Sequence, residues 1–222
     1  IIIKIILKLM TKINEAKKIM GKNFIGPDEF KKMADFIKLL IPITIHSLPF
    51  SEDFLKKHNK DFILIMGVKK DVEGRLLTIN RLRSIFGTDP VKFEPCFYNQ
   101  DWYLKEKFAR ETTLTNKWYL VAKEVVPASR GIEPKKALRC LPKSAMFPSA
   151  ILAIFTFFAY YFISDGEMLW RHDFIWCDDS DHNGDRIYTG RYIDPNGINK
   201  NGFNIHRHLS IRPCYGAAPV II

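Results

Sequence analysis

The chain has 222 residues, of which 47% are hydrophobic and 26% are charged. That composition is ordinary for a folded globular protein and excludes a chain that is disordered throughout. The formal net charge of +10 favours nucleic acid, an anionic membrane or an acidic protein as a partner. No long run of lysine and arginine concentrates the charge, so solvated surface lysines are the simpler explanation.

The first nine residues, IIIKIILKL, are apolar but too few to cross a membrane, and no small-residue cleavage site follows them. We expect residues 1–9 to be an upstream extension of the reading frame, with Met10 as the true start; a short membrane-tethering segment is the alternative. Since no secretory signal is visible, the cytoplasm is the favoured compartment. The four cysteines would be reduced there, whereas Cys177 and Cys214 could form a disulfide in an oxidising compartment.

The N-terminal part of the chain mixes helical periodicity with short apolar runs. Apolar residues three and four apart predict helices, and Gly21 and Gly87 are placed to end two of them. Short runs rich in β-branched and aromatic residues predict buried strands. The predicted elements are helices over 12–20, 28–40, 78–86 and 102–108, a short helix after Ser51, and strands over 61–68 and 117–126.

Residues 148–164 are the most apolar segment of the chain. Among the 14 residues from Ala150 to Ile163 only Thr156 is clearly polar. A membrane-spanning helix needs about 20 apolar residues, so this segment predicts a central core helix and no transmembrane span.

The character of the sequence changes after Gly166, where clusters of Asp, Asn and Gly separate short apolar pieces. This pattern is typical of strands and turns and predicts strands over 174–176, 186–192 and 206–212. We therefore predict an α+β protein with a helix-rich N-terminal region (1–128), a connector (129–147) and a C-terminal region (148–222) that joins the hydrophobic helix to a loop-rich β part. The two regions are expected to share one core.

The loop WCDDSDHNGDR contains the densest group of acids. From Asp179 it matches the start of an EF-hand loop, but Gly190 stands where the twelfth position needs a bidentate Glu, which excludes an EF-hand. Turns between strands are the simplest explanation, since Asn183-Gly184 is a strong turn dipeptide. A different calcium loop is the alternative, and its candidate ligands are Asp179, Asp181, Asn183 and Asp185.

The last fifty residues carry a family resemblance. The residues that carry it are Trp176 with the Asp/Ser-rich stretch that follows, Arg186-Ile187-Tyr188, Gly197, Asn199 and the closing Leu209-Ser210-Ile211-Arg212-Pro213-Cys214. Together they resemble the end of bacterial C-type-lectin-like domains, in particular the collagen-like lectin C-terminal domain and the Fibrobacter major-paralogue domain. The resemblance implies a loop-rich β fold that displays ligand-binding residues on its last strands. It does not imply calcium-dependent sugar binding, because the sugar sites of this fold use an E-P-N or Q-P-D triplet before the tryptophan strand. In this chain the comparable triplet, Asp194-Pro195-Asn196, lies after Trp176. As a whole the chain resembles proteins of bacterial metagenomes, which implies no activity.

The leading hypothesis is a non-enzymatic recognition protein whose partner is a protein or a carbohydrate. Aromatic, arginine and asparagine side chains are common on adaptable binding surfaces. The predicted ligand-binding residues are Arg186, Tyr188, Arg191, Tyr192, Asn199, Asn201, Phe203, His206 and His208.

Two alternatives belong to other classes. A nucleic-acid-associated protein would use the basic residues between Lys12 and Lys38 together with Arg81 and Arg83, and its binding would weaken steeply with salt. A hydrolase would use the Asp/His cluster at 172–208, with Asp179, Asp181 or His206 in a concave pocket, and His172, His182 and His208 as further sources of a base. No G-x-S-x-G, H-E-x-x-H or phosphate-loop motif supports an enzyme.

Overall fold

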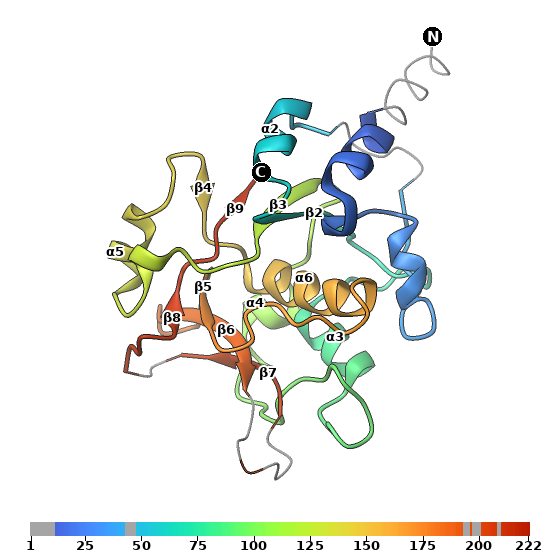
Figure 1. Cartoon of the computed structure of the whole chain (residues 1–222). Helices are drawn as coiled ribbons and strands as arrows, with labels where there is room; N and C mark the ends of the chain where they lie inside the picture. The colour runs from blue at the N-terminus through green and yellow to red at the C-terminus, as the bar shows by residue number, and fades with distance from the viewer. Residues whose placement is uncertain (1–11, 43–47, 193–195, 197–200, 208–209) are drawn as a thin grey trace.

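The computed structural model describes residues 12–42, 48–192, 196, 201–207 and 210–222, and they form two open sheets with helices around them (Figure 1). The predicted α+β class is confirmed. The first sheet has the strand order β1-β2-β3-β9-β4. Only the β1–β2 pair in it is parallel. Its strands are β1 (Phe24–Ile25), β2 (Phe62–Met66), β3 (Trp118–Ala122), β9 (Val220–Ile221) and β4 (Ala145–Met146).

The second sheet has the order β7-β6-β5-β8 and is built entirely from the C-terminal part of the chain. Strands β5, β6 and β7 are antiparallel neighbours, and β8 runs parallel to β5. The strands are β5 (Phe174–Ser180), β6 (Arg186–Tyr192), β7 (Gly202–His206) and β8 (Tyr215–Gly216). The third predicted strand, over 206–212, is therefore placed too late in the chain, and residues 208–209 lie outside the described part.

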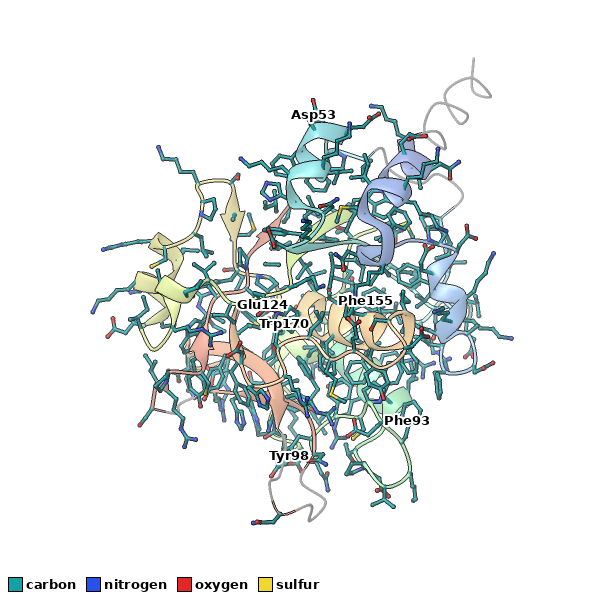
Figure 2. All side chains as sticks on the ribbon, viewed as in Figure 1. Asp53, Phe93, Tyr98, Glu124, Phe155 and Trp170 are labelled. Atoms are coloured by element: carbon teal, nitrogen blue, oxygen red, sulfur yellow. The ribbon has the colours of Figure 1, made fainter. Side chains whose placement is uncertain are left out.

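Helix α6 (Ala150–Ile163) lies in the middle of the molecule, and Figure 2 shows its Phe155 surrounded by side chains. The Ser149 side chain accepts a hydrogen bond from the Leu152 N–H and begins the helix. Every residue from Ala150 to Tyr160 is buried, so the prediction of a core helix is confirmed. The described residues include no helix that is both long and apolar enough to span a membrane.

One apolar core joins the two sheets through α6. It contains Leu64 of β2, Leu120 of β3, Ile187 of β6 and Phe203 of β7. Strand β9, near the end of the chain, completes the first sheet between β3 and β4 (Figure 1). The N-terminal and C-terminal parts therefore pack around the same core.

Most of the predicted helices and strands of the N-terminal part are present. Residues 12–20 are helical, and Ser51 and Thr78 cap α2 (Glu52–His58) and α3 (Ile79–Phe86) with their side chains. Gly87 ends α3 with φ +66°, a conformation that favours glycine. The short helix α4 (Lys107–Arg110) begins later than the predicted 102–108 segment, which is mostly turns.

The predicted helix over 28–40 is wrong over most of its length. Only the 3-10 helices η1 (Gly21–Asn23) and η2 (Glu29–Met33) form in this region. The Leu40 N–H donates to the Lys70 carbonyl at 2.9 Å, and the Val72 N–H donates to the Lys38 carbonyl at 2.9 Å. Pairing with residues 70–72 keeps 38–40 extended, so a tertiary contact overrides the helical periodicity.

The segment predicted as a connector contains regular structure of its own. It begins at the last residue of η3 (Pro127–Ser129) and includes α5 (Pro134–Arg139) and strand β4. Because β4 pairs with β9, the end of this segment belongs to the first sheet. In Figure 1, α5 and the loop that leads to β4 project from one side of the molecule.

Candidate functional site

The predicted ligand-binding residues lie on both faces of the second sheet, because side chains alternate along a strand. On β6, Arg186 and Tyr188 point to the face away from α6, whereas Arg191 belongs to the opposite set. Tyr188 and Phe203 are each only 1% exposed. The prediction that these two aromatic side chains line an open surface is therefore wrong, since both pack in the interior.

The face of the second sheet away from α6 carries an aromatic cluster. Its rings come from all four strands, with centroid distances of 5.1 Å for Trp176–Tyr188, 4.7 Å for Tyr188–Tyr215 and 5.7 Å for Tyr188–His206. Burial lowers the pKa of His206 to about 4, with a smaller effect from Arg212. His206 thus contributes a neutral ring to packing in this cluster.

Arg191 is held inside the structure by an ion pair. Its Nη1 and Nη2 donate to the two Glu94 carboxylate oxygens at 2.7 and 2.8 Å, and the arginine side chain is 6% exposed. Arg186 binds closer to the surface, at 3.0 Å from the Asp178 carboxylate. Asn201 is half-buried. The side chain of Tyr192, and Asn199 and His208 entirely, lie outside the described residues.

The acidic loop forms a tight turn between β5 and β6. One carboxylate oxygen of Asp181 accepts hydrogen bonds from the N–H groups of Asn183 (2.9 Å) and Asp185 (2.8 Å). Burial alone would raise the pKa of Asp181, but these N–H groups and Arg207 lower it below its usual value. The Asp179 carboxylate instead accepts from the Ala150 N–H at 2.6 Å, and burial raises its pKa.

These contacts bear on the predicted calcium site. Asp179 directs its carboxylate to the first turn of α6, whereas Asp181 directs its carboxylate to the turn and to Arg207. The arrangement does not converge these oxygens on a common point, as a calcium ion with its six to eight oxygen ligands requires. Calcium binding by Asp179, Asp181, Asn183 and Asp185 therefore stays a prediction that needs a rearranged loop.

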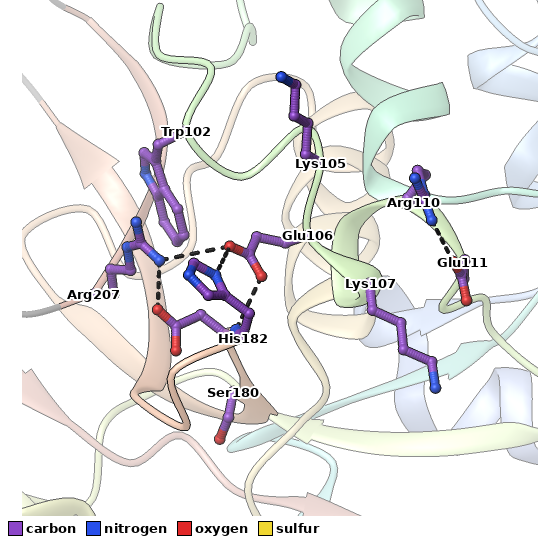
Figure 3. Close-up of a pocket in the computed structure, with 10 residues that line it drawn as sticks. Trp102, Lys105, Glu106, Lys107, Arg110, Glu111, Ser180, His182 and Arg207 are labelled. Atoms are coloured by element: carbon purple, nitrogen blue, oxygen red, sulfur yellow. Dashed lines mark hydrogen bonds and ion pairs between the residues drawn. The ribbon is translucent and has the colours of Figure 1, made fainter.

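A groove of about 750 Å³ lies where this turn meets the segment before α4 (Figure 3). We call it the Glu106 groove, after the buried acid at its base. Figure 3 shows Trp102 beside Arg207 at one end, His182 next to Glu106, and Lys105 and Lys107 extending in different directions. The groove is lined by Trp102, Lys105, Glu106, Lys107, Arg110, Glu111, Ser180, Asp181, His182 and Arg207.

A carboxylate–histidine pair lies in the groove. Glu106 Oε1 is 2.6 Å from His182 Nδ1, and Glu106 Oε2 accepts from the His182 backbone N–H at 3.0 Å. The Glu106 side chain is 9% exposed and the His182 side chain 63% exposed. Within the described part of the chain the other ring nitrogen of His182, Nε2, has no hydrogen-bond partner. The buried acid thus orients an imidazole whose free nitrogen is accessible from the groove.

Arg207 connects the two buried carboxylates. Its Nη1 lies 2.5 Å from Asp181 Oδ2 and 3.5 Å from Glu106 Oε1. The guanidinium also lies over the Trp102 ring, 4.4 Å from the ring centroid, and the Trp102 indole N–H donates to the Ile205 carbonyl at 3.1 Å. A fixed aromatic ring and two acids therefore hold the arginine in one orientation.

Glu106, Asp181 and His182 could also hold a metal ion, since one ligand atom from each lies within 4.8 Å of the others. Arg207 already supplies a positive charge at both carboxylates, and a metal ion would have to displace it. The geometry as it stands is that of two carboxylates bridged by an arginine rather than of a cation site.

The sequence predicts only part of this groove. The hydrolase hypothesis includes Asp181 and His182 and the calcium hypothesis includes Asp181, whereas no sequence pattern indicates Trp102, Glu106 or Arg207. Glu106 lies 76 positions before His182 and belongs to no motif. A neighbouring segment of the fold brings it there, so no local pattern could have identified it.

The arginines of the nucleic-acid hypothesis have internal partners. Arg81 donates to the buried Asp71 carboxylate through Nε and Nη2, at 3.2 and 3.0 Å. Arg83 donates to the Gln100 carbonyl at 3.2 Å. These two side chains hold α3 against its neighbours, and they do not form part of an open basic surface.

The chain matches no protein-family model, no curated protein and no solved structure.

Proposed function

We propose that the protein is a recognition protein that binds a small ligand bearing a carboxylate or phosphate group in the Glu106 groove. The observation that carries this proposal is the hydrogen-bonding state of Arg207. The shortest contact of each of its acidic partners is with Nη1, and its hydrogen bond to Asp181 also comes from Nη1. Among the described residues no group accepts from Nε or Nη2. The Nε–Nη2 edge of a guanidinium can pair with two oxygens of one anion.

The surroundings of Arg207 support anion binding in two further ways. Stacking on Trp102 and pairing with Asp181 fix the guanidinium before a ligand arrives, which lowers the entropic cost of binding. The exposed Lys105 and Lys107 flank the groove without an ion-pair partner in the described part of the chain. They would raise the local concentration of an anion.

The resemblance to C-type-lectin-like domains agrees with this location. Such a fold would display its ligand-binding residues on the last strands and their loops. Arg207 follows β7 directly, and His182 lies in the turn between β5 and β6. The proposal therefore keeps the recognition hypothesis and moves its site from the Tyr188 face of the second sheet to the end of its strands at the β5–β6 turn.

Binding can be tested by thermal shift with inorganic phosphate and with citrate, using chloride at matched ionic strength as the reference. Arg207→Lys keeps the charge but loses the planar fork, so we expect at least a tenfold weaker affinity, since charge-assisted hydrogen bonds contribute about 1.5–3 kcal/mol. Arg186→Lys is the matched control, because Arg186 is a similarly exposed arginine outside the groove. Equal affinities of the two variants would refute the assignment.

Hydrolysis of an anionic ester is the second candidate, and the Glu106–His182 contact favours it. A carboxylate on Nδ1 leaves Nε2 to remove a proton from water, and Arg207 would stabilise the negative charge that develops on the substrate. The measurement is release of nitrophenol from the anionic ester nitrophenyl phosphate. We expect His182→Gln to abolish hydrolysis and leave phosphate binding within about threefold, as general-base removal costs chemistry more than affinity.

A further inference from the structure

A second surface of the molecule is defined by residues 133–146, which we call the basic lobe. It contains α5 and the loop that leads to β4, and it projects from the body of the protein (Figure 1). Four cationic residues occur within 135–143 and no acidic residue does. All four side chains are exposed: Lys135, Lys136, Arg139 and Lys143.

The lobe keeps most of its positive charge uncompensated. Glu133, the first residue of the lobe, is its one acid, and its carboxylate lies 3.7 Å from Lys136 Nζ. Across the described residues, Lys135, Arg139 and Lys143 have no ion-pair partner. The exposed Arg212 adds a further cation at the base of the lobe. Backbone hydrogen bonds connect it to the start of the lobe, since the Gly131 N–H donates to the Tyr215 carbonyl and the Tyr215 N–H donates to the Arg212 carbonyl. A patch of this kind fits an anionic partner.

Two large apolar side chains are exposed within the same lobe. Leu138 of α5 is 45% exposed and Met146 of β4 is 44% exposed. The helix is nevertheless well anchored, because Ala137 is fully buried against the aromatic cluster of the second sheet and Leu141 packs at its edge. Leu138 is therefore held on the outer side of a fixed helix, among lysines and an arginine.

We propose that the basic lobe binds the anionic surface of a lipid bilayer. Basic residues supply the attraction to acidic headgroups, and an apolar side chain between them can enter the interfacial region of the bilayer. Single-stranded nucleic acid, the other common anionic partner, is usually bound by exposed aromatic rings among basic residues. Residues 133–146 contain no aromatic residue, so the combination of cations with Leu138 and Met146 favours lipid.

The test is co-sedimentation of the full chain with phosphatidylcholine vesicles, with and without phosphatidylglycerol, at an ionic strength of about 0.1 M. We expect binding only to the anionic vesicles. Changing Lys135, Lys136, Arg139 and Lys143 to Gln should weaken it about fivefold for each charge and more than a hundredfold together. Leu138→Ser should weaken it by about tenfold without any change of charge.

A matched variant separates the lobe from the overall charge of the protein. Lys57, Lys60, Lys69 and Lys70 are also exposed and carry no side-chain ion pair in the described structure, so changing all four to Gln removes the same charge elsewhere. We expect this variant to lose less than tenfold. Equal losses for the two quadruple variants, or no binding of the natural chain to anionic vesicles, would overturn the proposal. Binding to single-stranded RNA that needs the four cations but not Leu138, without vesicle binding, would assign the lobe to nucleic acid instead.

Discussion

The turns at 71–75 and 181–185 have the same hydrogen-bond pattern but different arginine partners. In each turn, the carboxylate of the first residue, an aspartate, accepts hydrogen bonds from the backbone N–H groups two and four residues later. The backbone N–H of that aspartate donates to the carbonyl four residues later. The fourth residue of each turn is a glycine with positive φ. The segments are DVEGR and DHNGD. The acid-rich loop therefore forms, in its backbone, the same turn as DVEGR, a segment that lies outside the acid-rich stretch.

The two aspartates differ in which guanidinium nitrogens of their arginine partner they bind. Asp71 accepts from Arg81 through Nε and Nη2, so the pairing edge of that guanidinium is occupied inside the protein. Asp181 contacts Arg207 through Nη1, and among the described residues no group accepts from the corresponding Nε–Nη2 edge. The turn itself therefore only positions a carboxylate. The arginine that pairs with this carboxylate, and the nitrogens through which it pairs, decide whether the site is structural or available to a ligand.

The largest expected effect is on stability and separates the two aspartates. Asp71→Ala leaves two backbone N–H groups and two arginines without their acceptor, so we expect a loss of about 3 kcal/mol in the free energy of unfolding. Asp181→Ala leaves Arg207 near Glu106, so a loss of about 2 kcal/mol is expected. Urea unfolding of both variants measures the difference, and a larger loss for Asp181 would contradict it.

The pH dependence of stability checks the same pair. Both aspartates have pKa values below the ordinary range of an aspartate, because hydrogen bonds from N–H groups and arginines outweigh the effect of burial. A depressed pKa in the folded state stabilises the protein above about pH 4, and that stability is lost as the pH falls through the folded pKa. Asp71→Asn and Asp181→Asn should each flatten the decline of unfolding free energy between about pH 4 and pH 2.

The two turn glycines test whether the backbones are equivalent. Gly74 has φ +80° and Gly184 has φ +86°, and a Cβ at either position would meet no atom within 4 Å. Backbone strain is then the main cost of Gly→Ala, about 1 kcal/mol at each position. We expect equal losses in urea unfolding. We also expect only Gly184→Ala to change the affinity for phosphate, because the second turn alone lines the Glu106 groove.

The smallest expected effect is that of calcium. A calcium ion at 100 times its dissociation constant would add about 2.7 kcal/mol, or roughly 5–10 °C in melting temperature for a chain of this length. Because Asp179 and Asp181 already have N–H and arginine partners, we expect millimolar calcium and excess chelator to give the same melting temperature. A calcium-dependent rise that Asp181→Asn abolishes and Asp71→Asn retains would establish a calcium loop.

Local sequence by itself determined several elements of the fold. Ser51, Thr78 and Ser149 cap the helices that follow them, and Gly87 ends α3. The apolar run from Ala150 to Ile163 is a buried helix because no face of it can be exposed to water without cost. Such features depend on a few neighbouring residues, so a pattern in the chain is enough to predict them.

Tertiary structure decided the rest. Pairing with residues 70–72 keeps 38–40 extended, and strand alternation buries Tyr188 on one face of the second sheet and Phe203 on the other. The Glu106 groove needs three segments far apart in the chain: one carries Glu106, one His182 and one Arg207. Sequence alone could name His182 but not its partner, because long-range packing places a buried carboxylate beside an imidazole and no local spacing records it.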